Sequence, residues 1–281
     1  MIFKRLRTFY ILFVIGSVST PVYAQEIIYS NMTEYHSDLL AHVLSYFPEK
    51  NYYSKHTDEN LPKLRAFIKM ANNDGMDVMI GTSTKERESR YLPIRFPTLK
   101  GFNGWRVALV NKNTPDILAN LSTKTSFRRF TPGQFHTWTD TQILESNGVK
   151  VTKVSNVEGI FKMLENNRID YFPRSILEAH WDVSSRPQYN VAIDKHILIK
   201  YPTAYYFYVS KTNVALAKDI KTGLEYALAD GSFNKIFQRF YGQALKDLAL
   251  ESRQIFQLDN PYLLDKTPIE RKELWAQLPL K

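Results

Sequence analysis

Cysteine is absent from all 281 residues of the chain. The protein therefore forms no disulfide bond, holds no metal through thiolate ligands and performs no thiol chemistry. The same absence excludes a lipid anchor on a cysteine behind an N-terminal leader. Stability must come from an apolar core, and a chain of this length can bury the core of one large or two moderate domains.

Long apolar runs are missing after the N-terminus. Near the start, three basic residues precede an apolar run over residues 9–18, and the tripeptide VYA at 22–24 resembles a cleavage site. The apolar run is too short to span a membrane comfortably. We therefore expect residues 1–24 to be the cleaved signal peptide of a secreted protein. The alternative is an uncleaved N-terminal anchor.

Sequence patterns typical of catalysis are absent as well. The six histidines show no H-x-H or H-E-x-x-H spacing, so no metal site is predicted. The chain has no G-x-S-x-G turn, no P-loop and no dinucleotide-binding glycine pattern. A pair of carboxylates that act as in a glycosidase remains an alternative, although no spacing in the sequence identifies such a pair. We expect a binding protein without metal or cofactor rather than an enzyme.

Positive charge exceeds negative charge only mildly once the predicted signal peptide is removed. The chain has 37 basic and 28 acidic residues, and the first 24 residues hold three of the basic ones, which leaves 34 − 28 = +6. Arg128-Arg129 is the only tight basic pair in the middle of the chain, and no nucleic-acid-binding motif accompanies it. We expect no nucleic-acid partner, and a surface that favours anionic ligands.

Predicted strands and helices alternate along the first part of the chain. Apolar residues at helical spacing separate short apolar runs that indicate strands. The expected strands are 26–29, a segment starting at 52, 78–80 and 105–110, and the expected helices are 34–47 and 61–70. This alternation predicts an α/β domain on a parallel sheet.

A second block repeats the pattern. Its expected helices are 140–147 (capped by Thr139), 157–166 and 176–181, and its expected strands are 149–154 and 169–172, the latter ended by Pro173. The chain returns through an aromatic strand at 205–209 into helical sequence that Gly231 interrupts. The remainder, rich in proline, is predicted to be an ordered tail.

The stretch DGMDVMIGTSTKERESRYLPIRFPTLKG, residues 74–101, predicts an anion site. A buried strand ends at Gly81, and Ser83 and Glu86 have the spacing of a capping box that starts a helix. Arg87 falls in the first turn of that helix, next to unpaired backbone N–H groups. The alternative is an ordinary surface arginine on a strand-turn-helix unit.

Three separated blocks resemble one family of proteins. They are the stretch 74–101, the segment LENNRIDYFPRSILEA at 164–179, and the returning strand with the last helices at 205–242. Together they are similar to bacterial periplasmic solute-binding proteins of the type 2 class, near the polar amino-acid-binding family 3 of ABC transporters. The resemblance covers nearly all of the chain from residue 25 to Gly242.

This resemblance implies an α/β fold of two lobes. Each lobe would have a mixed or mostly parallel sheet flanked by helices, and two crossing hinge strands would join them. Lobe one would comprise residues 25–110 and 203–281, including a tail at 243–281, and lobe two residues 111–202. Ligand would bind in the cleft, since open α/β sheets bind ligands beyond the carboxyl ends of their strands.

The resemblance also implies binding residues. Thr82 and Arg87 match the positions that bind the carboxylate of the ligand, and Arg87 would form a two-pronged ion pair. Tyr35 lies near the aromatic platform of the family, the alternative being a core or surface tyrosine. In lobe two, His136 and Thr137 would complete the carboxylate clasp.

Trp138 and Arg174 carry alternatives of their own. Trp138 is predicted to form a cleft wall, or else a buried anchor. Arg174 and Ser175 occupy the region where the family has an aspartate for the α-ammonium group of the ligand, and Phe135 replaces a common glycine. We therefore expect an acidic or multiply anionic ligand between Arg87 and Arg174. The alternative is that Arg174 forms a structural salt bridge.

The predicted function is capture of a small, carboxylate-bearing or anionic solute by hinge closure, followed by presentation to an inner-membrane ABC permease. The alternative is a periplasmic sensor subunit acting on a membrane kinase or cyclase. An enzyme on the same fold is the least favoured interpretation. We expect the protein to be a monomer.

Overall fold

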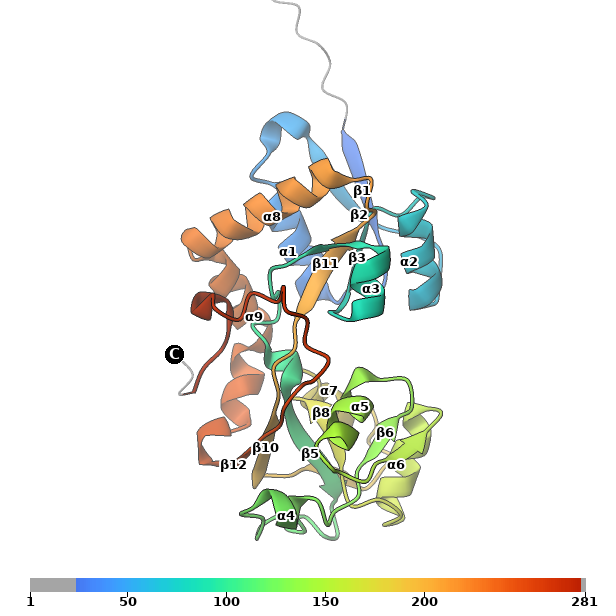
Figure 1. Cartoon of the computed structure of the whole chain (residues 1–281), viewed down its shortest axis with the longest axis vertical. Helices are drawn as coiled ribbons and strands as arrows, with labels where there is room; N and C mark the ends of the chain where they lie inside the picture. The colour runs from blue at the N-terminus through green and yellow to red at the C-terminus, as the bar shows by residue number, and fades with distance from the viewer. Residues whose placement is uncertain (1–23, 279–281) are drawn as a thin grey trace, which may run out of the picture.

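The computed structural model describes residues 24–278 and folds them into two lobes, drawn one above the other in Figure 1. Each lobe is built on its own sheet with helices packed against it. The two-lobed α/β fold predicted from the sequence is confirmed. The predicted signal peptide, residues 1–24, lies outside the described residues apart from Ala24.

The first sheet has five strands in the order β2-β1-β3-β11-β4. β1, β2 and β3 run parallel, and β11 is antiparallel to β3 and β4. The strands are β1 (Gln25–Tyr29), β2 (Tyr52–His56), β3 (Val78–Thr82), β4 (Leu92–Ile94) and β11 (Tyr205–Val209). Nearly all of β3 is buried, which fits the apolar sequence of a strand covered on both faces.

Five α-helices surround this sheet, and α1 packs against both α8 and α9. Apolar residues at helical spacing, among them Leu39, Leu40 and Val43, bury one face of α1. The helices are α1 (Glu34–Leu44), α2 (Lys63–Ala71), α3 (Lys85–Arg90), α8 (Val214–Ala229) and α9 (Ser232–Asp247), with a 3-10 turn η1 (Pro48–Lys50) after α1.

The second sheet has the order β12-β10-β5-β8, with β9 also paired to β5. β10 and β12 are parallel, but β5 is antiparallel to β8, β9 and β10, so this sheet is mixed and not mostly parallel. Its strands are β5 (Trp105–Asn111), β8 (Phe172–Ser175), β9 (Val191–Ile193), β10 (Ile197–Lys200) and β12 (Gln254–Gln257). A small parallel pair, β6 (Gly133–Phe135) with β7 (Thr152–Val154), lies nearby. The helices of this lobe are α4 (Lys124–Phe127), α5 (Thr139–Ser146), α6 (Val157–Glu165) and α7 (Ala179–Ser184).

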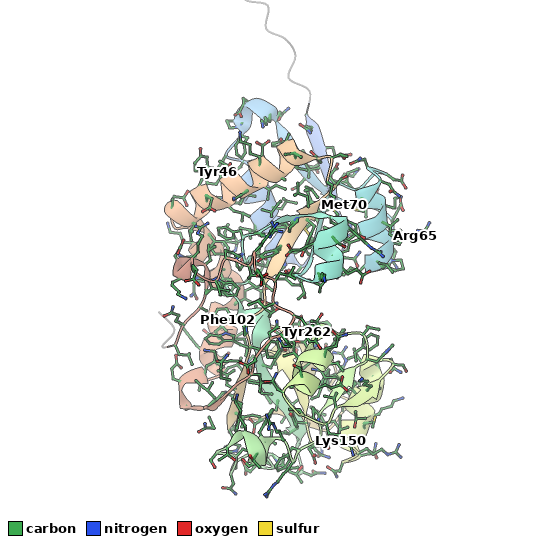
Figure 2. The ribbon with its side chains drawn as sticks, viewed as in Figure 1. Tyr46, Arg65, Met70, Phe102, Lys150 and Tyr262 are labelled. Carbon is green, nitrogen blue, oxygen red and sulfur yellow. The ribbon has the colours of Figure 1, made fainter. Side chains whose placement is uncertain are left out.

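Two segments cross between the sheets and touch each other. The first runs from β4 through the 3-10 turn η2 (Phe102–Gly104) into β5, and the second links β10 to β11. The Tyr201 backbone N–H donates to the Gly104 carbonyl at 3.0 Å. A side chain at Gly104 would collide with the Tyr201 carbonyl oxygen, so glycine permits this close approach. Figure 2 shows Phe102 at this junction.

The C-terminal tail returns from the second lobe to the first (Figure 1). After a 3-10 turn η3 (Leu250–Ser252), β12 pairs with β10. Near its end, η4 (Lys272–Leu274) follows Arg271, whose guanidinium binds both carboxylate oxygens of Glu225 on α8 at 2.6 and 2.9 Å. The tail is therefore ordered and contacts both lobes.

Several local predictions differ from the structure. The predicted lobe boundaries place residues 105–110 and the tail in lobe one. In the structure, β5 and β12 are both strands of the second sheet. No strand was predicted at β9, β10 or β12, which are only three or four residues long. Pro173 lies inside β8, which tolerates it because β8 is the last strand in the sheet order.

Candidate functional site

A cavity of about 750 Å³ lies between the lobes. Its walls come from the starts of α1 and α2, the end of β3, the crossing segments, and the loop before α5 and the segment after β8. These segments converge because the strands that precede them end on the same side of each sheet. The volume suits a small organic solute.

Seven of the eight residues predicted for the site line this cavity. They are Tyr35, Thr82, Arg87, Thr137, Trp138, Arg174 and Ser175. Within residues 24–278 the cavity lining does not include the eighth, His136, whose side chain is exposed and whose backbone N–H donates to the Val154 carbonyl at 3.0 Å. The backbone of His136 therefore extends the β6–β7 pairing.

Arg87 reaches the cavity from α3. Its guanidinium donates to the Thr82 carbonyl and lies over the Phe67 ring, 5.0 Å from the centroid. The predicted capping box of Ser83 and Glu86 is wrong, because Thr84 is the cap and accepts from the Arg87 backbone N–H at 3.1 Å. The Ser83 N–H still bonds to the Ala204 carbonyl, so the chain leaves the sheet one residue later than expected.

Tyr35 is a core residue at the edge of the cavity. Its side chain is 1% exposed, and its hydroxyl donates to the Thr98 carbonyl at 2.6 Å. Its ring packs against Phe237 and Phe240 of α9 at centroid distances of 5.8 and 5.7 Å. Burial raises the pKa of the Tyr35 hydroxyl well above its ordinary value. This environment matches the core alternative rather than an open aromatic platform.

Arg174 is held by two carboxylates of its own lobe. Its Nε donates to Asp182 at 2.5 Å, and its Nη2 lies 2.8 Å from Glu178. Burial raises the pKa of Asp182 even though Arg174 opposes this shift. Trp138 covers the guanidinium at 5.1 Å. Arg174 thus forms the structural salt bridge that was the alternative to a ligand-binding role, and Trp138 serves as both wall and cover.

A second cavity arginine whose charge is neutralised by a carboxylate, Arg106, was not predicted from the sequence. Arg106 of β5 is 8% exposed, donates to Tyr201 at 3.0 Å, and forms an ion pair with Asp140 of α5. Tyr201 also donates to Asp140. Burial opposes the charge of Arg106, but Asp140 and Tyr201 outweigh this and hold its pKa above the ordinary value. The expected cap at Thr139 is wrong, since Trp138 occupies the cap position.

Lys63, at the start of α2, was also missed. Its ammonium donates to the Tyr205 hydroxyl at 2.9 Å, and both side chains line the cavity. Within residues 24–278, neither Lys63 nor Arg87 has a carboxylate within 4.0 Å. The sequence held one usable signal, because Lys63 follows β2 at the carboxyl end of a parallel strand.

Two further groups define the polarity of the cavity. His36 is 2% exposed, and burial, with the charge of Lys63 adding to it, lowers its pKa to about 3. Asn103 in η2 is 8% exposed, and its side-chain oxygen has no hydrogen-bond partner among the described residues. A neutral histidine and an unused amide oxygen thus accompany the two cations.

The part of the chain at 24–278 contains no group of three or more His, Asp or Glu side chains that could hold a metal ion. No helix in the same part is long and apolar enough to cross a membrane.

Solved structures of amino-acid-binding proteins share this fold. An ancestral arginine-binding protein with bound arginine is 18% identical, covering 77% of this chain and 98% of its own at a TM-score of 0.54. The probable amino-acid ABC transporter extracellular-binding protein ytmK from Bacillus subtilis is 14% identical, covering 78% of this chain and 99% of its own at 0.60. No protein-family model and no curated protein matches the sequence.

A third similar structure comes from work on glutathione import through GshT and the cystine ABC importer TcyBC of Streptococcus mutans. It is 14% identical and covers 78% of this chain and 96% of its own, with a TM-score of 0.56. At these identities the likeness establishes the fold and leaves the ligand to be argued from this chain. The protein has the two-lobed fold of type 2 periplasmic solute-binding proteins, similar to those of amino-acid ABC transporters.

Proposed function

We propose that the protein is a periplasmic solute-binding protein that captures a small, carboxylate-bearing ligand between its lobes and presents it to an ABC-type permease. The observation that carries the proposal is the pair of cations, Arg87 and Lys63, on the first-lobe wall of the cavity, with no carboxylate within 4.0 Å of either among residues 24–278. A partly buried cation without a counter-ion favours an anionic ligand.

Arg87 is the primary anchor. Its guanidinium offers several N–H donors in a planar fork, and the Thr82 carbonyl occupies only one side of it. A ligand carboxylate can therefore bind the remaining donors without displacing a protein carboxylate. Thr137 and Ser175 add hydroxyl groups from the second lobe, so a bound ligand would contact both walls.

Contacts from both walls would favour the closed form. A ligand shifts an open–closed equilibrium only by its difference in affinity for the two forms, and contacts with both lobes form fully only on closure. The similar structures include an arginine-binding protein, a probable extracellular-binding protein of an amino-acid ABC transporter, and a structure from work on glutathione and cystine import. These similarities support a transport role and a ligand with a carboxylate group.

Thermal unfolding of the purified protein with organic acids, amino acids and short peptides tests this proposal. A ligand at about 100 times its Kd stabilises the native state by about 2.7 kcal/mol and raises the melting temperature. We expect Arg87→Met to weaken binding of the best acid about 10- to 100-fold, as for loss of a charge-assisted hydrogen bond.

Arg90→Met provides the matched control. Arg90 lies on the same helix, its side chain is 57% exposed, and its only ion pair among the described residues is with Glu86 at 3.4 Å. This variant removes the same charge away from the cavity and should bind normally. An unchanged affinity in Arg87→Met, or a preference for cations without an acid group, contradicts the proposed anchor.

The sensor alternative makes a different cellular prediction. A transport protein is required for uptake of its ligand, whereas a sensor subunit changes the activity of a membrane kinase or cyclase. Uptake of the labelled ligand should therefore fall when the gene is deleted. Normal uptake together with a lost signalling response would support the sensor.

A further inference from the structure

Lys63 is positioned differently from an ordinary surface lysine. It occupies the first turn of α2 and is only partly exposed, and its ammonium lies 2.9 Å from the Tyr205 hydroxyl and 5.3 Å from the centre of the Tyr205 ring. These two contacts direct the charge into the cavity. A tyrosine hydroxyl satisfies one of the three donors of the ammonium and leaves its charge uncompensated.

The sheet register brings Lys63 close to Arg87. Tyr205 of β11 is directly opposite Thr82 of β3. Directly opposed residues in an antiparallel pair have Cα atoms about 4.5 to 5.5 Å apart. Lys63 binds the side chain of Tyr205 and Arg87 binds the carbonyl of Thr82, so both cations are attached to the same end of the sheet.

Nearby carboxylates do not cancel these two charges in the way they cancel the other cations of the cavity. Arg106 is paired with Asp140, and Arg174 with Asp182 and Glu178. Glu34 also lines the cavity, but within the part of the chain at 24–278 its carboxylate is not within 4.0 Å of any cation. The first-lobe wall therefore holds two separate sites for negative charge.

We propose that Lys63 is a specificity-determining residue that binds a second acidic group, so that the ligand is a small dianion, such as a dicarboxylate, with one acid group on Arg87 and the other on Lys63. This inference rests on the proposed solute-binding function and defines its ligand class. It replaces Arg174, whose charge is already neutralised, as the second anion-binding residue.

Matched acids test the inference by isothermal titration calorimetry. The probes are the diacids malonate, succinate, glutarate and adipate, each compared with the unbranched monoacid of the same number of carbons. We expect the wild-type protein to bind one diacid about 10-fold or more tighter than its matched monoacid, since a charge-assisted contact contributes about that much. Lys63→Met should remove this preference, because we expect it to lower diacid affinity about 10-fold more than monoacid affinity.

Two further variants test whether the loss of diacid preference in Lys63→Met has another cause. Arg65→Met removes a charge from the same helix outside the cavity lining, and Figure 2 shows Arg65 at the outer edge of the first lobe. It should keep the preference, because its charge is exposed and screened. Lys63→Arg keeps the charge and should retain much of the preference, which also shows that substitution at this position preserves the fold.

The outcomes separate the two proposals. Diacid preference that survives in Lys63→Met, or that Arg65→Met removes equally, overturns the role of Lys63. Equal affinity of wild-type protein for diacids and monoacids, with both lost in Arg87→Met, overturns the dianion inference and leaves the proposed function standing. If the wild-type protein binds neither these acids nor any acid-bearing solute in the thermal panel, the proposed function fails as well.

Discussion

The two walls of the cavity use positive charge in opposite ways. On the wall from the first lobe, Lys63 and Arg87 contact a hydroxyl and a backbone carbonyl. On the wall from the second lobe and its entry strand, Arg106 and Arg174 contact carboxylates whose side chains are 17% exposed or less, apart from the outer Glu178. Residues of the same charge therefore serve different purposes: the first pair is available to a ligand, and the second pair holds the wall together.

The difference follows from the cost of burying charge. An isolated buried ion is costly, and an ion pair offsets this only when further hydrogen bonds satisfy both partners. Arg106 meets that condition through Asp140 and Tyr201, and Arg174 through Asp182 and Glu178. Lys63 and Arg87 are partly exposed to solvent, so they can remain charged without a carboxylate until a ligand arrives.

Asp140→Asn should have the largest effect on stability. The substitution removes the negative charge beside Arg106, whose side chain is 9% exposed, and leaves that guanidinium buried without a counter-ion. Breaking a buried pair in this way costs about 3 to 5 kcal/mol. Urea unfolding of the variant and the wild-type protein measures the loss directly.

The double variant Arg106→Met/Asp140→Leu is the control for this prediction. It removes both charges together, and replacing a buried pair by apolar residues is often neutral. We expect it to be more stable than Asp140→Asn alone. Exposed ion pairs typically contribute less than about 1 kcal/mol. If Asp140→Asn lowers the free energy of unfolding by no more than this, the second-lobe wall does not depend on neutralising Arg106 with a carboxylate.

A neutral His36 is expected to make stability depend on pH. Its folded pKa of about 3 lies below its ordinary value of 6.5, so between these values the unfolded chain binds a proton that the folded protein does not. Stability from this group is present above pH 6.5 and is lost as pH falls toward 3, by about 1.4 kcal/mol per pH unit. The groups around it, Thr33, Thr98, Tyr35, Tyr205 and Lys63, provide no carboxylate to stabilise a charged imidazole.

His36→Gln isolates this contribution from other titrating groups. Buried carboxylates such as Asp77 and Asp194 have raised pKa values and act with the opposite sign. The difference in unfolding free energy between wild-type and variant proteins should therefore shrink as pH falls from 7 to 4.5. A difference that stays constant over this range contradicts the lowered pKa of His36.

The sequence predicted the fold and the anchoring side of the site more accurately than the pairing of charges. Arg87 could be placed because its position depends on local order, a buried strand followed by a turn and helix. Arg174 also lines the cavity, but its partner Asp182 lies on the following helix, α7. Side-chain packing decides whether the carboxylate of Asp182 reaches Arg174. The pair Arg106 and Asp140 is separated by 34 positions, and no local pattern connects them.

Lys63 shows a different limit. Its residue type and place after β2 were visible, but its orientation depends on Tyr205, which lies 142 positions later in the returning strand. A similar dependence on distant residues applies to β12, since Gln254 of β12 pairs with Ile197 of β10, which lies 254 − 197 = 57 positions earlier. Local sequence patterns placed residues at the cavity. Contacts between residues far apart in the sequence decide which of the charged side chains there can bind a ligand.

Glu178→Gln should have the smallest effect. Glu178 pairs with Arg174 at 2.8 Å, but its side chain is 53% exposed, and such pairs contribute at most about 1 kcal/mol. Arg174 would keep Asp182, whose side chain is 1% exposed, so urea unfolding should show a loss below about 1 kcal/mol and a larger loss for Asp182→Asn. Removing an exposed negative charge from the cavity should also tighten binding of an anionic ligand slightly. Suppose that Glu178→Gln destabilises the protein as much as Asp182→Asn. The stabilisation that a carboxylate provides by pairing with Arg174 then does not depend on how deeply that carboxylate is buried, and the contrast between the two walls loses its physical basis.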